Sequence, residues 1–230
     1  MKLLNYLLII ITSPVLVCSA HAQEYYFSIQ AGLNSSDLNL KSASGTNQLT
    51  SPSAGFGLGA SVGYNLNENF ALELQPMYVE KKTTQMATTA NPNITFAMTF
   101  IEIPLLLKVS TGNTIRPYLK AGPTIGFLLR AEAESEDGGV VSGQSYKADL
   151  DDVLKNVNFS LVLGAGVSFH LGQSQIFIEG QYHKGLLDLY QGGQIEWKSA
   201  EEILIVKGNE AAELYTSGIV VVMGISFPIY

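Results

Sequence analysis

The chain has 230 residues, of which 47% are apolar and only 14% charged, with 22 Gly and 11 Tyr. That composition is poor in charge for a water-soluble enzyme. Lys plus Arg minus Asp plus Glu gives 13 − 20 = −7, and an acidic chain lacks the clustered basic surface that nucleic-acid binding requires, which excludes nucleic acid as a partner.

The N-terminus is typical of a segment that directs export. One lysine precedes a long apolar run, and the small-x-small sequence "AHA" follows it. A membrane anchor is the rival interpretation, but Pro14 interrupts the run, so we expect residues 1–22 to be a cleaved secretory signal peptide and 23–230 to be one mature domain. Cleavage removes the lysine and Cys18, the only cysteine, which leaves 12 − 20 = −8 and no disulfide chemistry.

Alternation of apolar and small or polar residues then recurs along the mature chain. In 55–64, "GFGLGASVGY", one face is apolar and the other carries almost only Gly and Ser. A period of two predicts β-strands with unlike faces. The same pattern predicts eight strands, at about 24–32, 55–64, 70–80, 95–109, 115–130, 158–170, 175–185 and 217–229.

Short and long connections alternate between these strands. Three are short turns of Asn, Gly and Ser, at 65–69, 110–114 and 171–175, and four are long and polar, around 33–54, 81–94, 131–157 and 186–216. This pattern predicts an all-β, eight-stranded antiparallel up-and-down transmembrane β-barrel, with short periplasmic turns and four long outer loops. An even strand count places both termini on the periplasmic side of the outer membrane of a double-membrane bacterium.

A soluble periplasmic, lipocalin-like barrel is the structural rival, and the two folds differ in which face is apolar. Here the less apolar face collects ionisable side chains, whose burial in a ligand pocket would be costly. We therefore expect a polar network in the lumen, made of Glu73, Gln75, Glu102, Lys108, Arg116, Lys120, Glu179 and Gln181.

The segment 100–109, "FIEIPLLLKV", fixes the phase of one strand. Its odd positions are all apolar and are expected to face lipid, whereas Glu102 and Lys108 face the interior. A turn centred near Gly112 predicts that Lys108 pairs with Arg116 and that Glu102 lies diagonal to Lys120. We expect a packed, salt-bridged interior, since eight strands enclose little more space than side chains fill, and a proton or ion path is the alternative.

Upstream of this segment the apolar positions are even, at Phe96, Met98 and Phe100. Either a bulge shifts the phase there, or these residues lie above the membrane.

The residues also resemble a known family. The segments "FIEIPLLLKV" and "RPYLKAGPTIGFLL" (116–129), together with "EGQYHKGLLDL" (179–189), closely resemble the PorT-like outer membrane β-barrel family over nearly all of the mature chain. The resemblance implies a small outer membrane barrel, and a few members of that family are linked to protein secretion.

Catalytic chemistry has little support in the sequence. His183 with Asp188 and a loop serine would imitate a hydrolase triad, while His170 lies by a turn at the other rim, and nothing fixes their geometry. We expect no catalytic residue, cofactor or metal site, with His183 a solvated rim histidine. A barrel enzyme acting on lipid or peptide is the alternative.

Aromatic residues cluster at the strand ends and predict two interfacial girdles. They are Tyr25, Tyr64, Phe70, Phe169 and Phe227 at the periplasmic rim, and Tyr78, Phe127 and Tyr182 at the outer rim.

Partners are expected in the outer membrane lipid and at two loops, 131–157 and 186–216. The first is acidic but lacks the residue order of a calcium loop, so solvated charge is favoured over Ca²⁺ binding. In the second, 203–206 is expected to form a protruding hairpin whose edge recruits a protein by strand addition. The sequence thus predicts a structural or interaction protein, for adhesion or secretion, acting through its surface loops.

Overall fold

A computed structural model describes residues 25–41, 50–85, 93–136, 146–198, 203–207 and 213–229. The predicted signal peptide, 1–22, lies outside these residues. The strands are β1 (Tyr25–Lys41), β2 (Thr50–Asn65), β3 (Phe70–Leu74), β4 (Met77–Gln85), β5 (Asn93–Ser110), β6 (Ile115–Glu136), β7 (Tyr146–Asp149), β8 (Val157–Leu171), β9 (Ser174–Gly185), β10 (Gln194–Lys198), β11 (Ile203–Lys207) and β12 (Glu213–Ile229). None of the described segments is a helix of the length and apolar character that crosses a membrane.

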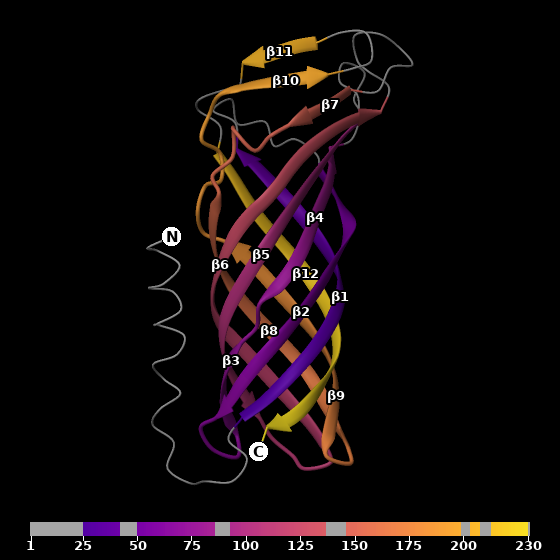
Figure 1. Cartoon of the computed structure of the whole chain (residues 1–230), viewed down its shortest axis with the longest axis vertical. Helices are drawn as coiled ribbons and strands as arrows, with labels where there is room; N and C mark the ends of the chain where they lie inside the picture. Colours follow the sequence, from indigo (N-terminus) through magenta and orange to yellow (C-terminus); the bar gives the residue numbers. More distant parts are fainter. Residues whose placement is uncertain are drawn as a thin grey trace.

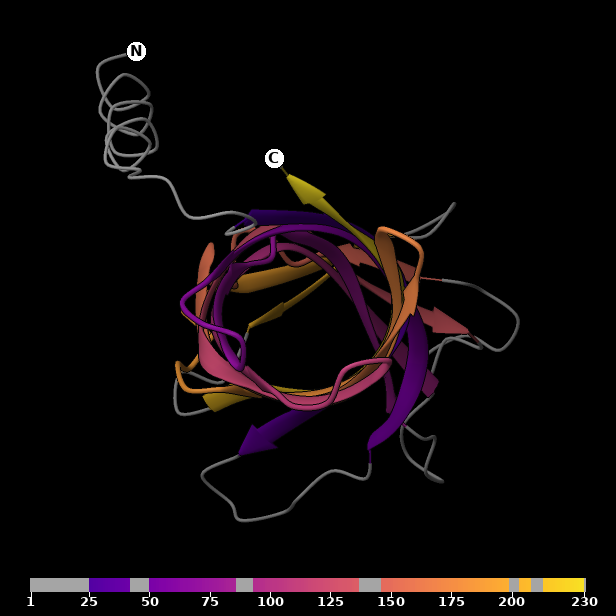
Figure 2. The same cartoon turned by 90° about the horizontal axis from the view of Figure 1, so that it is seen from below.

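Eight strands close into an antiparallel barrel, in the order β1–β2–β3/β4–β5–β6–β8–β9–β12 (Figures 1 and 2). β3 and β4 form one barrel strand interrupted at Gln75 and Pro76, and both pair with β5. β1 pairs with β12 from Tyr25–Ile229 to Lys41–Glu213, which closes the ring. The predicted count of eight barrel strands is confirmed.

The short turns gather at one end of the barrel, which we call the turn end (Figure 1). In the first turn the Asn67 side chain accepts hydrogen bonds from the backbone amides of Asn69 and Phe70, both at 2.9 Å. Gly112 and Gly172 supply the positive φ angles of the other two, 95° and 65°. Local turn chemistry therefore sets the hairpins that the sequence predicts.

The outer surface of the barrel is apolar, and the inner surface carries the polar residues. Leu163, Leu119 and Met223 are 60%, 63% and 63% exposed, whereas Glu73, Glu102 and Glu179 are at most 2% exposed. A lipocalin hides its apolar face inside, so the lipocalin-like alternative is wrong for this chain.

At the other end, the outer end, β5 and β6 turn apolar side chains inward. In β5, Met98 and Phe100 are buried at 1% and 0% exposure, in the same inward phase as Glu102. In β6 the pairing with β5 shifts between Thr99 and Phe100, after which Ala131 and Ala133 point inward. The phase thus changes on β6 and not on β5, because the extra residue lies on β6.

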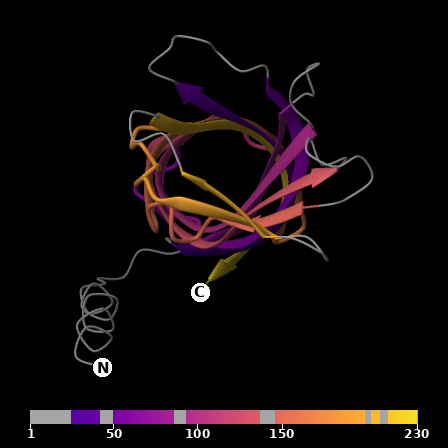
Figure 3. The ribbon, with the colours of Figure 1, turned by 90° about the horizontal axis from the view of Figure 1, so that it is seen from above.

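Strands continue into the segments that the sequence assigns to loops. β1, β2, β4, β5 and β6 all extend there, and β6 pairs with β7, which pairs with the β10–β11 hairpin (Figures 1 and 3). The hairpin expected around 203–206 is therefore present.

An apolar cluster fills the barrel at the outer end, and we call it the outer plug. It buries Met98, Phe100, Ala131, Ala133, Ala148, Leu150, Val153, Leu154 and Leu189. The segment after β7 is fastened to the barrel by a hydrogen bond from the Leu150 amide to the Ala131 carbonyl, 2.9 Å.

Candidate functional site

The lumen holds a continuous network of buried charges. At its centre the Lys120 ammonium on β6 lies 2.7 Å from a Glu73 oxygen on β3 and 2.9 Å from a Glu179 oxygen on β9. Tyr26 donates a hydrogen bond to Glu73 and Tyr118 donates one to Glu179, both at 2.6 Å. One lysine therefore joins strands on opposite sides of the barrel. The Tyr26 hydroxyl satisfies the other Glu73 oxygen and the Gln181 amide satisfies the other Glu179 oxygen, as buried charges require.

A second ionic group lies nearer the outer end. The Lys81 ammonium on β4 lies 2.6 Å from one Glu102 oxygen, and Nδ1 of His183 on β9 lies 3.2 Å from the other, at ion-pair distance without hydrogen-bond geometry. Nε2 of His183 lies 2.9 Å from the side-chain oxygen of Gln181, whose amide nitrogen donates to Glu179. Gln181 thus links the two ionic groups.

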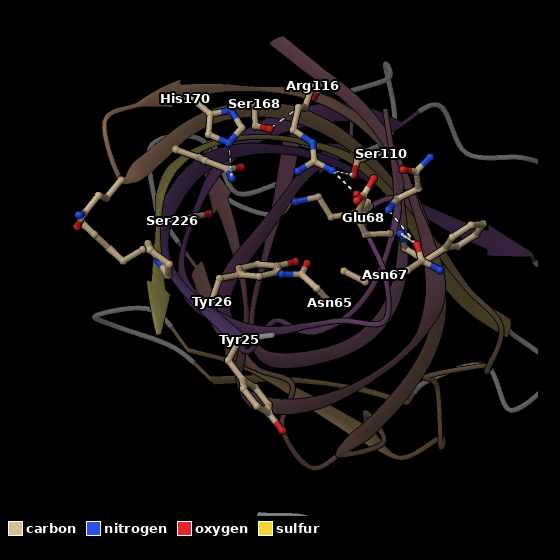
Figure 4. Close-up of a pocket in the computed structure, with 18 of the residues that line it drawn as sticks. Tyr25, Tyr26, Asn65, Asn67, Glu68, Ser110, Arg116, Ser168, His170 and Ser226 are labelled. Atoms are coloured by element: carbon tan, nitrogen blue, oxygen red, sulfur yellow. Dashed lines mark hydrogen bonds between the residues drawn. The ribbon is translucent and has the colours of Figure 1, made fainter. Parts of the chain in front are cut away.

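Of the eight residues predicted for this network, seven point into the lumen within it or beside it. Gln75 accepts a 3.4 Å hydrogen bond from Gln181, and Lys108 lies 4.0 Å from Glu73 and over the Tyr118 ring at 4.4 Å. Arg116 lies apart, at the turn end, where its guanidinium donates to the Glu68 carbonyl and to the Ser110 hydroxyl (Figure 4).

The predicted pairing of β5 with β6 is wrong. Lys108 pairs with Lys120 instead of Arg116, and Glu102 pairs with Gly126, so Glu102 is not diagonal to Lys120. The reason lies in the turn: the Thr111 amide donates to the Pro117 carbonyl, so β5 and β6 begin to pair only at Ser110 with Tyr118.

Sequence reasoning missed Lys81 and Tyr26, and it left Tyr118 out of the network although Tyr118 lies on the same face as Lys120. The bare inner face of 55–64 is a signal that could have found one of them, because a Cβ at Gly63 would lie 2.0 Å from the Tyr26 ring. A Cβ at Gly166 would likewise lie 2.5 Å from Tyr118. Glycines on the inner face make room for these tyrosines.

The expectation for His183 is corrected: it is only 4% exposed and lies inside the lumen. Its two ring nitrogens face Glu102 and Gln181, so no triad with Asp188 forms. His170 lies by a turn and contacts Gln175.

Asp188 instead fastens the outer end of the chain. Its carboxylate accepts from the backbone amides of Leu214 (2.8 Å) and Tyr190 (3.0 Å) and pairs with Lys155 at 3.2 Å. Partial burial raises the pKa of Asp188, but these hydrogen bonds and the lysine outweigh it and hold the pKa below its ordinary value.

Several described acidic residues of the segment 131–157 have structural partners. Asp151 accepts from the Ala131 amide at 2.6 Å, Glu132 pairs with Arg130, and Glu134 pairs with Lys147 at 3.1 Å. Among the described residues, no three His, Cys, Asp or Glu side chains lie close enough together to hold a metal ion. Side chains 136 and 137 lie outside that description.

All eight residues of the predicted girdles lie on the outward phase of their strands. Tyr25 and Tyr64 contact each other with ring centroids 5.0 Å apart, and Phe70, Phe169 and Phe227 are 41%, 39% and 39% exposed. Tyr78, Phe127 and Tyr182 are 37%, 44% and 44% exposed. Their role at a membrane interface stays a prediction.

A family model described as "Outer membrane protein beta-barrel domain" matches residues 21–191, and the chain belongs to that family. It is therefore an outer membrane β-barrel protein that sits in the lipid bilayer. The finer PorT-like resemblance is not part of that match.

The first of three similar solved structures, with a TM-score above 0.5, supports the fold. The outer membrane protein OprG from Pseudomonas aeruginosa is 12% identical, with 92% of this chain and 98% of that chain covered and a TM-score of 0.55. A major outer membrane protein from Thermus thermophilus is 11% identical, with 88% and 100% covered and a TM-score of 0.48. Neisserial surface protein A is 15% identical, with 88% and 97% covered and a TM-score of 0.42. No curated protein matches the chain in sequence.

Proposed function

We propose that the protein is a closed, non-enzymatic barrel that binds another protein at its outer end, with its turns and termini in the periplasm. One observation carries the proposal: the small sheet β6–β7–β10–β11 leaves the barrel and ends at β11, which among the described residues pairs only with β10. The edge of such a strand offers backbone amides and carbonyls to an added strand. A role in adhesion or secretion follows from this kind of contact.

Two features of the lumen support a closed barrel. Lys120 ties together carboxylates from opposite walls, and Phe100 and Met98 fill the outer end at 0% and 1% exposure. In planar bilayers the purified protein should give no discrete conductance steps. Regular conductance steps would contradict the closed lumen and would favour the alternative, a proton or ion path.

The absence of enzyme activity is also part of the proposal. The ring nitrogens of His183 face Gln181 and Glu102 within the lumen, and Asp188 holds backbone amides, so neither side chain lies beside a nucleophile. Ala at His183 should therefore change stability but abolish no lipid- or peptide-directed activity of cells that produce the protein.

The test of strand addition uses consecutive positions of β11. Neighbouring residues of an edge strand point their amide groups alternately toward the paired strand and toward solvent. Leu204→Pro and Ile205→Pro should thus act in different ways. One removes an amide that pairs with β10 and disrupts the hairpin, and the other removes an outward-facing amide to which an added strand would pair. Leu204→Val and Ile205→Val are the matched controls.

The readout is a photo-crosslinking amino acid placed at Lys207 in intact cells, with a second placed at Gln173 in a turn as the comparison. Protein adducts are expected from position 207, should persist in both valine variants and should be lost in both proline variants. Adducts that survive both prolines would show that the β11 edge is not the contact.

A further inference from the structure

A cavity of about 360 Å³ opens at the turn end of the barrel (Figure 4). Tyr26, Lys108, Ser110, Arg116 and Ser168 line it, together with residues of the turns between the strands. The Tyr26 side chain points into the barrel whereas Tyr25 points away from it. The volume falls in the lower part of the range for small-ligand pockets, roughly 300–1,000 Å³.

The positive charge of this cavity is not balanced by the lumen. Three buried acids, Glu73, Glu102 and Glu179, match the three lysines Lys81, Lys108 and Lys120 in number. Arg116 is then a surplus cation. It forms no ion pair with a described carboxylate; its partners are the Glu68 carbonyl and the Ser110 hydroxyl, so it keeps its full charge at the mouth.

The guanidinium also keeps a donor for an external acceptor. Nε of Arg116 is buried and has no hydrogen-bond partner among the described residues. A buried donor left unpaired costs free energy, so a rotation of the guanidinium that brings its donors to an acceptor in the cavity is favoured. Lys108, whose nearest carboxylate oxygen is 4.0 Å away, supplies a second cation on the same cavity wall.

The lining selects a singly charged ligand of peptide character. Arg116 is the cation that the buried acids leave over, Lys108 lies 4.0 Å from its acid partner Glu73, and Glu68 is the carboxylate that lines the cavity. This balance suits a monoanion better than a phosphate dianion. Asn and Gln side chains from the turns at 66–69 and 172–173 stand around the rim, and amides of this kind both donate to and accept from peptide groups.

We propose that the cavity is a binding site for the free carboxylate of a peptide, held by the guanidinium of Arg116 and the ammonium of Lys108. The inference rests on the proposed orientation of the barrel, which places this mouth in the periplasm. A periplasmic peptide or protein terminus would thereby dock under the barrel while the outer sheet binds a different partner.

The chain offers a direct reporter, because its only two arginines are Arg116 and Arg130. The Nε–H signals of the ¹⁵N-arginine-labelled full chain in detergent micelles would be followed while N-acetyl-Ala-Ala is added. Arg116 should shift and saturate, and Arg130, which pairs with Glu132 at the outer end, should not move. The C-terminal amide of the same peptide should leave both signals unchanged.

Lys108→Gln should weaken binding of the peptide about tenfold, the loss expected for one charge-assisted hydrogen bond. Lys155→Gln, an exposed lysine near the outer end, is the matched control and should bind normally. For Arg116→Gln, the signals of the peptide itself report the loss. An unshifted Arg130 signal shows that each variant is folded.

Three results would overturn the site: no shift of Arg116, equal shifts with the peptide amide, or equal shifts with inorganic phosphate, which would mean a general anion site only. Orientation is tested separately by Asn113→Cys, since the chain's one cysteine lies in the predicted signal peptide. Labelling of this cysteine by an impermeant maleimide on intact cells would overturn the periplasmic docking. Neither the peptide-binding result nor the maleimide result affects the crosslinking test at β11.

Discussion

On β5 and β6, the middle of the barrel buries charged side chains and the outer end buries apolar ones, although the same strands build both. Around Lys120 the inner face carries paired charges and the outer face is apolar. At the outer plug the inner face carries Phe100 and Ala131, and Glu132 and Glu134 take the outer phase of β6. In each region the inside holds the side chains that the surroundings solvate poorly: charged ones where the barrel faces hydrocarbon, and apolar ones where it faces water.

The surroundings explain the difference. A strand in a bilayer faces hydrocarbon, so apolar side chains turn outward and the polar ones must satisfy one another within. Once the strands leave the bilayer they face water, and the ordinary hydrophobic effect buries apolar side chains. We propose that the reversal on β5, between Glu102 and Phe100, lies near the membrane surface.

The largest effect is expected from removing the central cation. Lys120→Met leaves Glu73 and Glu179 buried without their shared partner, which should lower the free energy of unfolding by about 3–5 kcal/mol. Urea unfolding in lipid vesicles, followed by the fluorescence of the only tryptophan, Trp197, measures it. Adding Glu73→Gln and Glu179→Gln should restore much of the loss.

The matched control is Lys155→Met, because Lys155 pairs with Asp188 while 44% exposed. Surface pairs contribute about 0–1 kcal/mol. Equal losses for the two lysines would mean that the lumen is solvated and that its charges are not coupled.

A comparable loss is expected at the outer plug for a different reason. Phe100→Ala should cost about 3–5 kcal/mol, because it leaves a cavity where the ring is fully buried. The comparison variant is Phe127→Ala on the outer face, where the ring is 44% exposed and truncation leaves no enclosed cavity. The same unfolding measurement applies, and a smaller loss at Phe100 than at Phe127 would contradict a packed plug.

The outer face should respond differently to charge in the two regions. Leu163→Arg, in the middle of β8, should cost about 2–4 kcal/mol because it places a cation in hydrocarbon. Ala97→Arg, on the outward phase of β5 beyond the reversal, should cost about 0.5 kcal/mol or less. Heat-dependent gel mobility of the folded form gives a second readout. Equal costs would place the membrane surface elsewhere.

The smallest effect concerns pH at the outer end. The pKa of Asp188 is lowered in the folded chain, so its contribution is present above its ordinary pKa of about 3.9 and is lost as pH falls through the lowered value. Asp188→Asn should remove this dependence and cost about 1 kcal/mol or less near neutral pH, because the group is partly exposed. Unfolding of both forms from pH 7 to below pH 3 checks the sign. A larger difference in acid than at pH 7 would contradict it.

Much of the barrel could be predicted from local patterns. Alternation in 55–64 and 100–109 gave the phase of β2 and β5, and turn residues such as Gly112 and Gly172 gave the hairpins. Phase is predictable because a shift of one residue would turn every apolar side chain of a strand inward. The pairing of Lys108 was not predictable, since it depends on how the chain at Pro117 leaves the turn.

By itself, the sequence determined the inward face of the regularly alternating segments, such as 55–64 and 101–109, because the period of two acts within each strand. Only the tertiary structure decided which inward side chains meet. His183 on β9 and Glu102 on β5 are separated by β6 and β8 in the sheet, and they approach across the lumen because the sheet closes at β1 and β12. Closure joins residues distant in sequence, and no local pattern records the shear and register that set those contacts.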